Sequence, residues 1–251
     1  MDINGCVAIV TGGNRGIGEG FVRVLLASGA SKVYVGSRDP KAASHLVEEF
    51  GGRCEAVELD VTDHAEVTAA SAKCTDVNLV INNSGAFNNK TLMTAPDLSS
   101  AREEMEVNYF GVLAMCRAFA PVLGRNGGGA IVNVLSAAAI VSIPGMGGYP
   151  PSKSAARSLS TAVRAELADQ GTQVHALIVG SVDTRMAAHV AGAKETPEDI
   201  ARAGLKAVKH NIDEMDTDAM AIEVRASLAL DPKAVERRFA KSLKVQPNTG
   251  R

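Results

Sequence analysis

The chain is poor in the residues that mark several large classes of protein. Its 251 residues include four cysteines and five histidines, without the spacing of a zinc site or a disulfide framework. No metal site is expected, and the cysteines are predicted to be reduced thiols of a cytoplasmic protein. A formal net charge of −2 gives no sign of a nucleic-acid or anionic membrane partner.

Long hydrophobic runs are also missing. No uninterrupted apolar stretch reaches the ~18 residues needed to cross a membrane. The N-terminus enters a strand pattern almost at once, so no signal peptide is expected. The chain has no internal repeat, low-complexity tract or linker. Because 46% of its residues are hydrophobic, it can build a sizeable core, and a single domain over residues 1–251 is predicted.

What the sequence does contain is an alternation of strand and helix patterns. Strands are predicted at residues 6–10, 32–37, 54–59, 78–81, 130–135 and 173–179, and helices at 19–28, 40–50, 63–72, 98–123, 149–170 and 197–210. A helical C-terminal tail is predicted at about 217–243. This alternation indicates an α/β fold, a single Rossmann-like, doubly wound parallel sheet of about seven strands with helices on both faces.

A glycine-rich turn joins the first strand to the first helix. Gly12, Gly16 and Gly18 would let the backbone turn tightly and approach a pyrophosphate, which the helix N-terminus would attract. An ordinary strand-to-helix turn is the alternative interpretation. The correct elements flank the motif on both sides, which favours dinucleotide binding.

The second strand ends in Ser37 and Arg38, where an NAD site usually carries an acidic residue for the ribose hydroxyls. A guanidinium suits a 2′-phosphate in both geometry and charge, and Arg15 would add a second cation. Asp39 is the competing candidate, but it precedes Pro40 and is interpreted as a helix cap. NADP(H) is therefore predicted in preference to NAD(H).

The fifth strand leads to Ser136, and a loop then leads to Tyr149 and Lys153. If Tyr149 opens a helix, Lys153 lies one turn on, on the same face. An adjacent ammonium lowers the pKa of a phenol, which suits Tyr149 to proton exchange while Ser136 holds a carbonyl oxygen. A loop tyrosine and a solvated lysine are the alternative. Pro150 and Pro151 fit the first turn of a helix that starts at Tyr149.

Together these motifs resemble those of the classical short-chain dehydrogenase/reductase family, over about residues 7–186. Thr-Gly-x3-Gly-x-Gly is met by Thr11, Gly12, Gly16 and Gly18, and Asn-Asn-Ala-Gly by Asn82, Asn83, Ser84 and Gly85, with serine for alanine. The active-site set Asn, Ser, Tyr-x3-Lys is met by Asn108, Ser136, Tyr149 and Lys153.

The resemblance implies a role for each matching residue. Tyr149 would be the general acid/base, Ser136 would position the carbonyl, and Lys153 would tune the tyrosine and bond the nicotinamide ribose. Asn108 would hold a water in a proton relay. Asp60 would bond the adenine, and Thr184 the carboxamide or diphosphate. The predicted cofactor-binding residues are Gly12, Asn14, Arg15, Gly16, Ile17, Gly18, Ser37, Arg38, Asp60, Val61, Asn82, Asn83, Ser84, Gly85, Tyr149, Lys153, Gly180, Val182 and Thr184.

The implied function is NADPH-dependent reduction of an aldehyde or ketone to an alcohol, in the manner of a carbonyl reductase. Residues 137–146 and 182–195, the latter within a substrate loop of about 182–210, would line the pocket. Ile140, Val141, Ile143 and Met146 favour a small apolar carbonyl compound. A non-catalytic NADP(H)-binding sensor or regulator is the alternative function. An epimerase or dehydratase of sugar nucleotides usually needs a larger C-terminal domain.

Three features depart from the family pattern. Prolines follow Tyr149 where members carry small residues, which puts the position of the phenol in question. Val179 precedes Gly180 where Pro-Gly is usual, so a looser turn is expected on the nicotinamide side. The tail is charged and helical where many tetrameric members end in a strand, so a homo-oligomer, dimer or tetramer, or a monomer all stay open.

Overall fold

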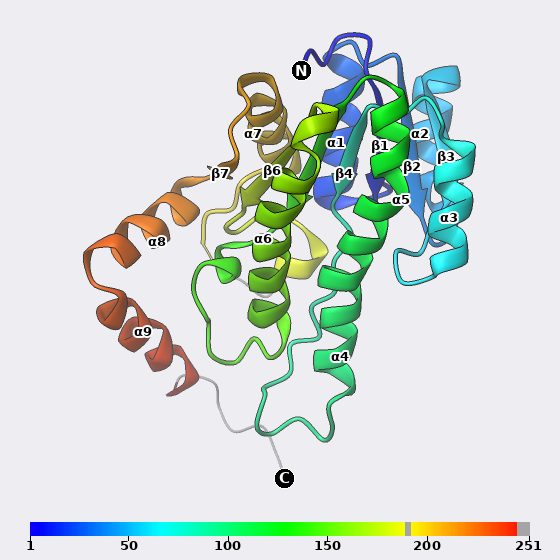
Figure 1. Ribbon diagram of the computed structural model, residues 1–251. Helices are drawn as coiled ribbons and strands as arrows, with labels where there is room; N and C mark the ends of the chain where they lie inside the picture. The colour runs from blue at the N-terminus through cyan, green and yellow to red at the C-terminus, as the bar shows by residue number, and fades with distance from the viewer. Residues whose placement is uncertain (189–191, 245–251) are drawn as a thin grey trace.

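Seven parallel strands form one sheet in the computed structural model, which describes residues 1–188 and 192–244 (Figure 1). The strands are β1 (Val7–Thr11), β2 (Lys32–Ser37), β3 (Cys54–Glu58), β4 (Leu79–Asn82), β5 (Gly129–Val134), β6 (Thr172–Ile178) and β7 (Glu214–Asp216). They lie in the order β3-β2-β1-β4-β5-β6-β7, and every neighbouring pair is parallel. The predicted doubly wound sheet is confirmed.

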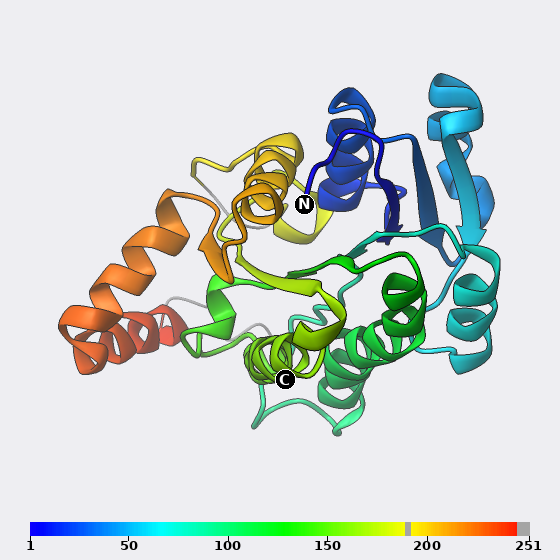
Figure 2. The same ribbon diagram turned by 45° about the horizontal axis from the view of Figure 1, so that its top comes forward.

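Helices cover both faces of the sheet (Figure 2). They are α1 (Gly16–Ala27), α2 (Ser44–Phe50), α3 (His64–Lys73), α4 (Ser99–Met105), α5 (Gly111–Arg125), α6 (Tyr149–Glu166), α7 (Pro197–His210), α8 (Ala219–Leu230) and α9 (Pro232–Ala240). Helices α1 and α7 lie on one face, and α3, α5 and α6 lie on the other. Helices α8 and α9 extend from the β7 edge, as Figures 1 and 2 both show.

The alternation of side chains along each strand supplies both cores. Successive side chains of a strand point to opposite faces of the sheet, so a strand covered on both sides must be apolar throughout. Val10 of β1 packs in a cluster with Phe21 of α1, whereas its neighbour Ile9 packs with Phe119 of α5. All four side chains are fully buried. The continuous apolar runs of the sequence are therefore the central strands.

The predicted helix at residues 98–123 is divided in the structure. Helix α4 ends at Met105, a π-helical turn spans Glu106–Phe110, and α5 continues from Gly111. A π turn is a wider turn that is often found at functional sites. Asn108 lies inside it, which gives the turn a place in the candidate site.

The continuous stretch Ser99–Arg125 is the one helix of the described residues that is long and apolar enough to cross a membrane, with a mean hydropathy of 1.3 over its best window. Counting uninterrupted apolar runs missed it, because polar residues interrupt the sequence. Met115, Phe119 and Leu123 are completely buried in the cluster that packs against the sheet. The helix therefore occupies the position of a core helix.

Both edges of the sheet carry paired charges. At the β7 edge, Glu214 accepts hydrogen bonds from Arg157 of α6 at 2.6 and 2.9 Å, and forms an ion pair with Arg225 of α8. At the β3 edge, Glu55 lies 2.7 Å from Lys32 and 2.6 Å from Lys73. No sequence pattern located β7, because three residues are too few to show an alternation.

Candidate active site

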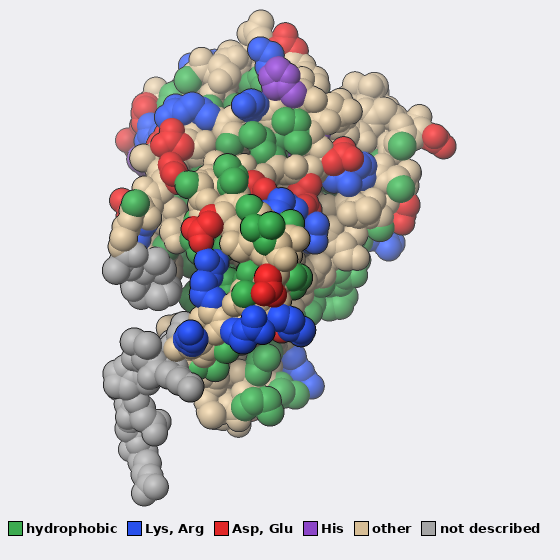
Figure 3. Space-filling model, turned by 90° about the vertical axis from the view of Figure 1, so that its left-hand side faces the viewer, with side chains coloured by type: hydrophobic (Ala, Val, Ile, Leu, Met, Phe, Trp, Pro, Cys, Tyr) green, Lys and Arg blue, Asp and Glu red, His purple; other side chains and the backbone are tan. Residues whose placement is uncertain are grey.

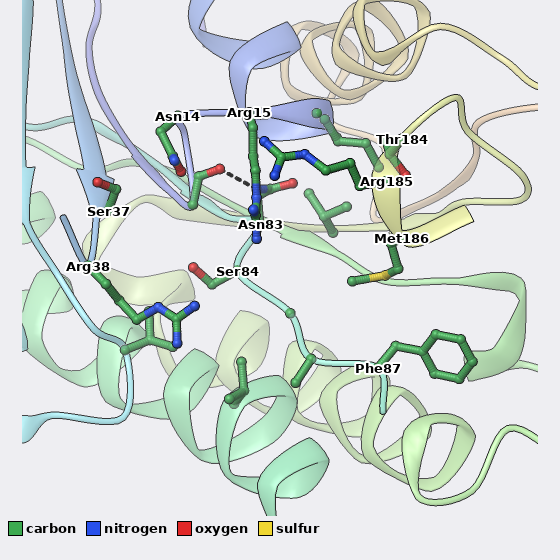
Figure 4. A pocket seen from close by; sticks show the side chains of 18 of the residues that line it. Asn14, Arg15, Ser37, Arg38, Asn83, Ser84, Phe87, Thr184, Arg185 and Met186 are labelled. Carbon is green, nitrogen blue, oxygen red and sulfur yellow. Dashed lines mark hydrogen bonds between the residues drawn. The ribbon is translucent and has the colours of Figure 1, made fainter. Parts of the chain in front are cut away.

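A cavity of about 740 Å³ opens where the carboxyl ends of the central strands meet. It lies beside β1, whose neighbours β2 and β4 mark the point at which the order of the strands reverses. Doubly wound sheets bind their ligands at this point. Figure 4 shows Ser37 and Arg38 towards one end of the cavity and Phe87 and Met186 towards the other.

Most of the residues predicted to bind a cofactor line this cavity. They are Gly12, Asn14, Arg15, Gly16, Ile17, Ser37, Arg38, Asp60, Val61, Asn83, Ser84, Gly85, Tyr149, Lys153 and Thr184. Asp60 is held by Thr62, whose backbone N–H and hydroxyl both donate to Asp60 Oδ1, at 2.9 and 2.7 Å. The motifs that lie far apart in the sequence thus converge on one cavity.

The glycine-rich turn has the backbone geometry that the motif predicts. Gly12 and Gly16 have positive φ angles of 61° and 53°, which other residues rarely adopt. A Cβ atom on Gly18 would lie 2.2 Å from the carbonyl oxygen of Gly12. The side chain of Arg15, at the N-cap of α1, makes no capping hydrogen bond. The first turn of α1 is therefore a suitable site for an anion.

The segment after β4 is tied to the same turn. Thr11 Oγ1 accepts hydrogen bonds from the backbone N–H groups of Asn83 and Ser84, both at 2.9 Å. Asn83 Nδ2 donates to the carbonyl oxygens of Thr11 and Gly12, at 2.9 and 3.2 Å, the second of which is drawn in Figure 4. These bonds bring two backbone segments together around the floor of the cavity.

The cavity end at β2 carries Arg38 and, beside it, the carboxylate of Asp39. The Asp39 side chain accepts from the Lys41 N–H at 3.0 Å and caps the turn Pro40–Ala43, so its interpretation as a cap is confirmed. Arg15 and Arg38 line the cavity, and neither forms an ion pair within residues 1–188 and 192–244. Two uncompensated guanidinium groups fit a phosphate-bearing ligand.

Tyr149 is the first residue of α6 and is only 8% exposed. Its phenol faces the Ser136 hydroxyl, which is close enough to act on the pKa of the phenol. Burial raises the pKa of Tyr149, the Ser136 hydroxyl lowers it, and the Glu104 carboxylate raises it. The predicted lowering by Lys153 is therefore wrong for this structure, because burial outweighs the other effects and Lys153 is not among them. The raised pKa keeps the phenol protonated at neutral pH, the form that a proton donor needs.

Lys153 lies one turn further along α6 and lines the same cavity as Tyr149, as predicted. Its Nζ atom donates to the carbonyl oxygen of Val134 at 3.0 Å and lies 5.8 Å from the centroid of the Tyr149 ring. Burial lowers the pKa of Lys153 to about 8. The amine thus stays mostly protonated at pH 7 and is closer to losing its proton than an exposed lysine.

Asn108 has the partners that a buried asparagine inside a helix requires. Its side chain donates to and accepts from the backbone of Ala86, both at 2.9 Å, and donates to Ser152 Oγ at 2.9 Å. The Ser152 hydroxyl in turn donates to the Tyr149 carbonyl oxygen at 2.8 Å. Asn108 therefore connects the segment after β4 to the first turn of α6. Its role in a water relay stays a prediction.

The prolines after Tyr149 do not displace the phenol from Ser136. Pro150 and Pro151 occupy the first turn of α6, where the missing N–H groups have no helical partners. The helix begins at Tyr149 as predicted and ends at Glu166, before the predicted end at residue 170. The prolines therefore leave the phenol next to Ser136, whose hydroxyl lowers the pKa of Tyr149.

The turn after β6 is held by a hydrogen bond in place of a proline. Asp218 is 7% exposed; its Oδ2 atom accepts from the Gly180 N–H at 2.6 Å and its Oδ1 atom from the Ala221 N–H at 3.0 Å. The looser turn expected from the missing proline is thus offset by a carboxylate that also caps α8. The C-terminal tail is therefore connected to the turn at Gly180, which leads to Thr184 in the lining of the cavity.

Several predicted residues lie outside the lining of the cavity: Gly18, Asn82, Asn108, Ser136, Gly180 and Val182. Asn82 serves the interior, where its Nδ2 atom donates to Asn133 Oδ1 at 2.8 Å. Val182 is 3% exposed and belongs to the core on the α1 side. These residues match the family motifs. A motif match alone does not distinguish a residue that contacts the ligand from one that supports such a residue.

The substrate end of the cavity differs most from expectation. Ile140, Val141 and Ile143 pack with Val224 of α8 and Val235 of α9, and do not line the cavity. The lining there comes instead from Phe87, Asn88, Glu103, Arg185 and Met186. Residues 189–191 of the predicted substrate loop lie outside the described residues.

Two of these segments follow directly from motifs already identified. Phe87 and Asn88 continue the Asn-Asn-Ser-Gly segment, and Arg185 and Met186 follow Thr184, so extending each motif by two or three residues would have found them. The Phe87 ring meets the Tyr149 ring edge-on, with centroids 5.2 Å apart. Glu103 could not be found in this way, because the helical pattern around it does not show which side of the helix faces the cavity.

The fold and site together define a dinucleotide-binding α/β protein of the oxidoreductase type. The family model for short chain dehydrogenases matches residues 6–195, and the chain belongs to this family. It is 34% identical over 202 residues to the galactitol 2-dehydrogenase (L-tagatose-forming) of Cereibacter sphaeroides, which covers 78% of each chain. It is 31% identical over 207 residues to the oxidoreductase UcpA of Salmonella typhimurium, covering 78% of this chain and 76% of that protein.

Solved structures agree over a longer part of the chain. A short chain dehydrogenase from Burkholderia cenocepacia J2315, in complex with NADP, is 40% identical, with a TM-score of 0.90. The match covers 98% of this chain and 100% of that one. The likeness therefore extends past the residues of the family model and includes the C-terminal tail.

Proposed function

We propose that the protein is an NADPH-dependent oxidoreductase that reduces an aldehyde or ketone to an alcohol, reversibly, with Tyr149 as the general acid/base. The observation that carries this proposal is the buried Tyr149 phenol, with Ser136 and Lys153 beside it, in the same cavity as the unpaired Arg38. One end of the cavity has the groups for a phosphate, and the other has the groups for proton transfer.

The residues present fit a nicotinamide dinucleotide. Gly12 and Gly16 leave the floor free of side chains, and a Cβ atom on Gly16 would lie only 3.3 Å from Thr184. Arg38 would hold the 2′-phosphate, with Arg15 as a second cation. The similarity to a Burkholderia enzyme that binds NADP supports this choice of nucleotide. Bound NADPH would supply hydride to the carbonyl carbon.

The residues of the chain would handle the oxygen and its proton. Ser136 donates a hydrogen bond to the carbonyl oxygen and stabilises the negative charge that develops on it. Tyr149 gives its proton to the same oxygen, so that an alcohol leaves the site. Lys153, which lines the same cavity, would bond the nicotinamide ribose. Asn108 would position the water through which a proton returns.

The proposal extends to substrate, direction and setting. Phe87 and Met186 give the reacting end of the cavity an apolar surface, which supports a small apolar carbonyl or alcohol substrate. Reduction is the proposed direction in cells, since NADPH pools are kept reduced. Four free, buried cysteines support a cytoplasmic setting. A homo-oligomer, dimer or tetramer, is part of the same proposal.

The test is NADPH oxidation with a panel of aldehydes and ketones, comparing wild type with Tyr149→Phe. The wild type should turn over at least one apolar carbonyl compound. The phenylalanine variant should lose turnover by about 100-fold or more while still binding NADPH, because it lacks the proton donor. Tight NADPH binding without turnover across the panel would overturn the proposal in favour of a sensor.

A further inference from the structure

A buried carboxylate lies behind the reactive tyrosine and has no part in the chemistry described above. Glu104 is in the last turn of α4 and is 1% exposed. It falls on the same buried side of the helical stretch as Asn108, four residues on. No lysine or arginine pairs with it in the part of the chain that the structure describes. A buried carboxylate without a cationic partner is costly and requires hydrogen-bond donors.

Two backbone N–H groups supply those donors, and both border the active site. The Asn88 N–H donates to Glu104 Oε1 at 2.8 Å, and the Gly148 N–H donates to the same carboxylate. Asn88 follows Phe87, whose ring contacts Tyr149. Gly148 immediately precedes Tyr149. One side chain thus ties together the two segments that flank the phenol.

The contact with residue 148 is close enough to exclude any side chain there. A Cβ atom on Gly148 would lie 2.9 Å from Glu104 Oε2 and 2.8 Å from the Cα atom of Ala101. Helix α4 therefore rests directly on the backbone that enters α6, and a displacement of Glu104 is transmitted to Tyr149. A misplacement of about 1 Å at a catalytic group can cost about 100-fold in rate.

We propose that Glu104 is a positioning residue for Tyr149, which fixes the phenol through Asn88 and Gly148. This inference rests on the proposed function, since Tyr149 is the proton donor in it. Two backbone N–H donors face the carboxylate, and an ionised carboxylate can only accept hydrogen bonds.

The titratable groups near Glu104 are few. The pKa of Glu104 is raised: burial raises it most, the Asn88 and Gly148 donors lower it, and the like charge of Glu103 on its own helix raises it further. On α6, Tyr149 is the group on which Glu104 acts, and a negative charge there raises the pKa of the phenol. Removal of the Glu104 charge should consequently lower the pKa of Tyr149.

The experiment compares Glu104→Gln, Glu104→Asp and, as a control on the same helical stretch, the exposed Glu106→Gln. Turnover of NADPH with the best carbonyl compound of the panel is measured across pH, and NADPH affinity is measured separately. In Glu104→Gln, turnover should fall by about 10-fold or more at little change in NADPH affinity, and the alkaline limb of its pH profile should move to lower pH. Glu104→Asp keeps the charge, so its turnover should fall without that movement. Glu106→Gln should match the wild type.

A readout that needs no substrate is available because the chain has three tyrosines and no tryptophan. The tyrosinate absorbance of each protein, minus that of its Tyr149→Phe counterpart, reports the ionisation of this phenol. Glu104→Gln should ionise at lower pH than the wild type. Wild-type turnover and pH profile in Glu104→Gln would overturn the inference, and if that variant does not fold, wild-type turnover in Glu104→Asp would do so. Full activity of Tyr149→Phe would instead overturn the proposed function.

Discussion

Substitution of the buried Lys153 tests how much the burial of its ammonium group destabilises the folded protein. Burial lowers the pKa of Lys153 from 10.5 to about 8, and at about 1.36 kcal/mol per pKa unit this corresponds to about 3 kcal/mol. The charged amine is disfavoured in the folded chain. This loss of stability is fully present below about pH 8, where the folded and the unfolded chain both bind the proton. It disappears as the pH rises towards 10.5, because the folded chain releases its proton first.

The measurable quantity is the difference in unfolding free energy between wild type and Lys153→Met. Linkage of the two pKa values predicts that the wild type gains about 2 kcal/mol relative to the variant between pH 7 and about pH 9.5. Other titrating groups cancel in this difference, whereas the Lys153 bond to the Val134 carbonyl adds a constant. Urea unfolding without nucleotide, followed by circular dichroism, measures it at each pH.

The control is Lys209→Met, which removes an exposed lysine of α7. The same Lys153→Met protein should bind NADPH weakly and reduce the carbonyl panel poorly, since its amine is part of the site. A stability difference for Lys153→Met that stays constant from pH 7 to about pH 9.5 would refute the reasoning, because it would show that burial does not disfavour the ammonium.

Three further predictions concern the nucleotide. Arg38→Asp should weaken NADPH binding by about 10- to 100-fold, as expected for the loss of a charge-assisted hydrogen bond, and NADH binding far less. Equal losses of affinity in titrations with the two nucleotides would contradict its role. Gly18→Ala should abolish NADPH binding, since its Cβ atom would overlap the Gly12 carbonyl, whereas Gly52→Ala, with nothing within 4 Å, should bind normally in the same assay. Asp218→Ala should lose about 1–2 kcal/mol of stability in urea and also weaken NADPH. The comparable cap variant Asp231→Ala should lose stability alone, and unchanged NADPH affinity in both would speak against the connection from the tail to the cofactor turn.

Much of the fold could be predicted because its signals are local. Apolar strand runs, the glycine-rich turn and the prolines at the start of α6 each specify their element from neighbouring residues. Strand β7 could not be located, because three residues next to charged partners carry no periodicity. The π turn around Asn108 was equally invisible, since a single wide turn leaves the helical spacing of its neighbours almost unchanged.

The parts of the site that follow from residue type and motif position could be predicted. The parts that depend on the packing of distant segments could not. Tyr149, Ser136 and Lys153 come together as expected. The direction of the Tyr149 pKa was wrong, because burial is a property of the whole fold and the sequence shows only the neighbouring ammonium. Ile140 and Val141 suggested an apolar pocket, but the C-terminal helices that cover them lie far away in the sequence.

The tail itself gives the molecule an asymmetric surface. Figure 3 looks onto the side from which α8 and α9 project and shows Lys and Arg side chains gathered on its lower half. Lys233, Arg237 and Arg238 of α9 are exposed. The inner side of the same helices meets the segment after Ser136 through Val224 and Val235. Each of these cations is paired with an acid, Glu236, Asp231 and Glu223 respectively, so this pair of helices presents ion pairs outward and an apolar face inward.

The paired charges at the two rims of the sheet bear on how the protein behaves when crowded. An exposed edge strand has unpaired backbone N–H and C=O groups, to which a strand of another chain can bond, and this is a common route to aggregation. Here β7 has only three residues, and the charged side chains of Glu55 in β3 and Glu214 in β7 are already paired with cations from adjacent elements. An incoming strand would have to displace those ion pairs before it could add, so concentrated solutions of the folded protein should stay clear.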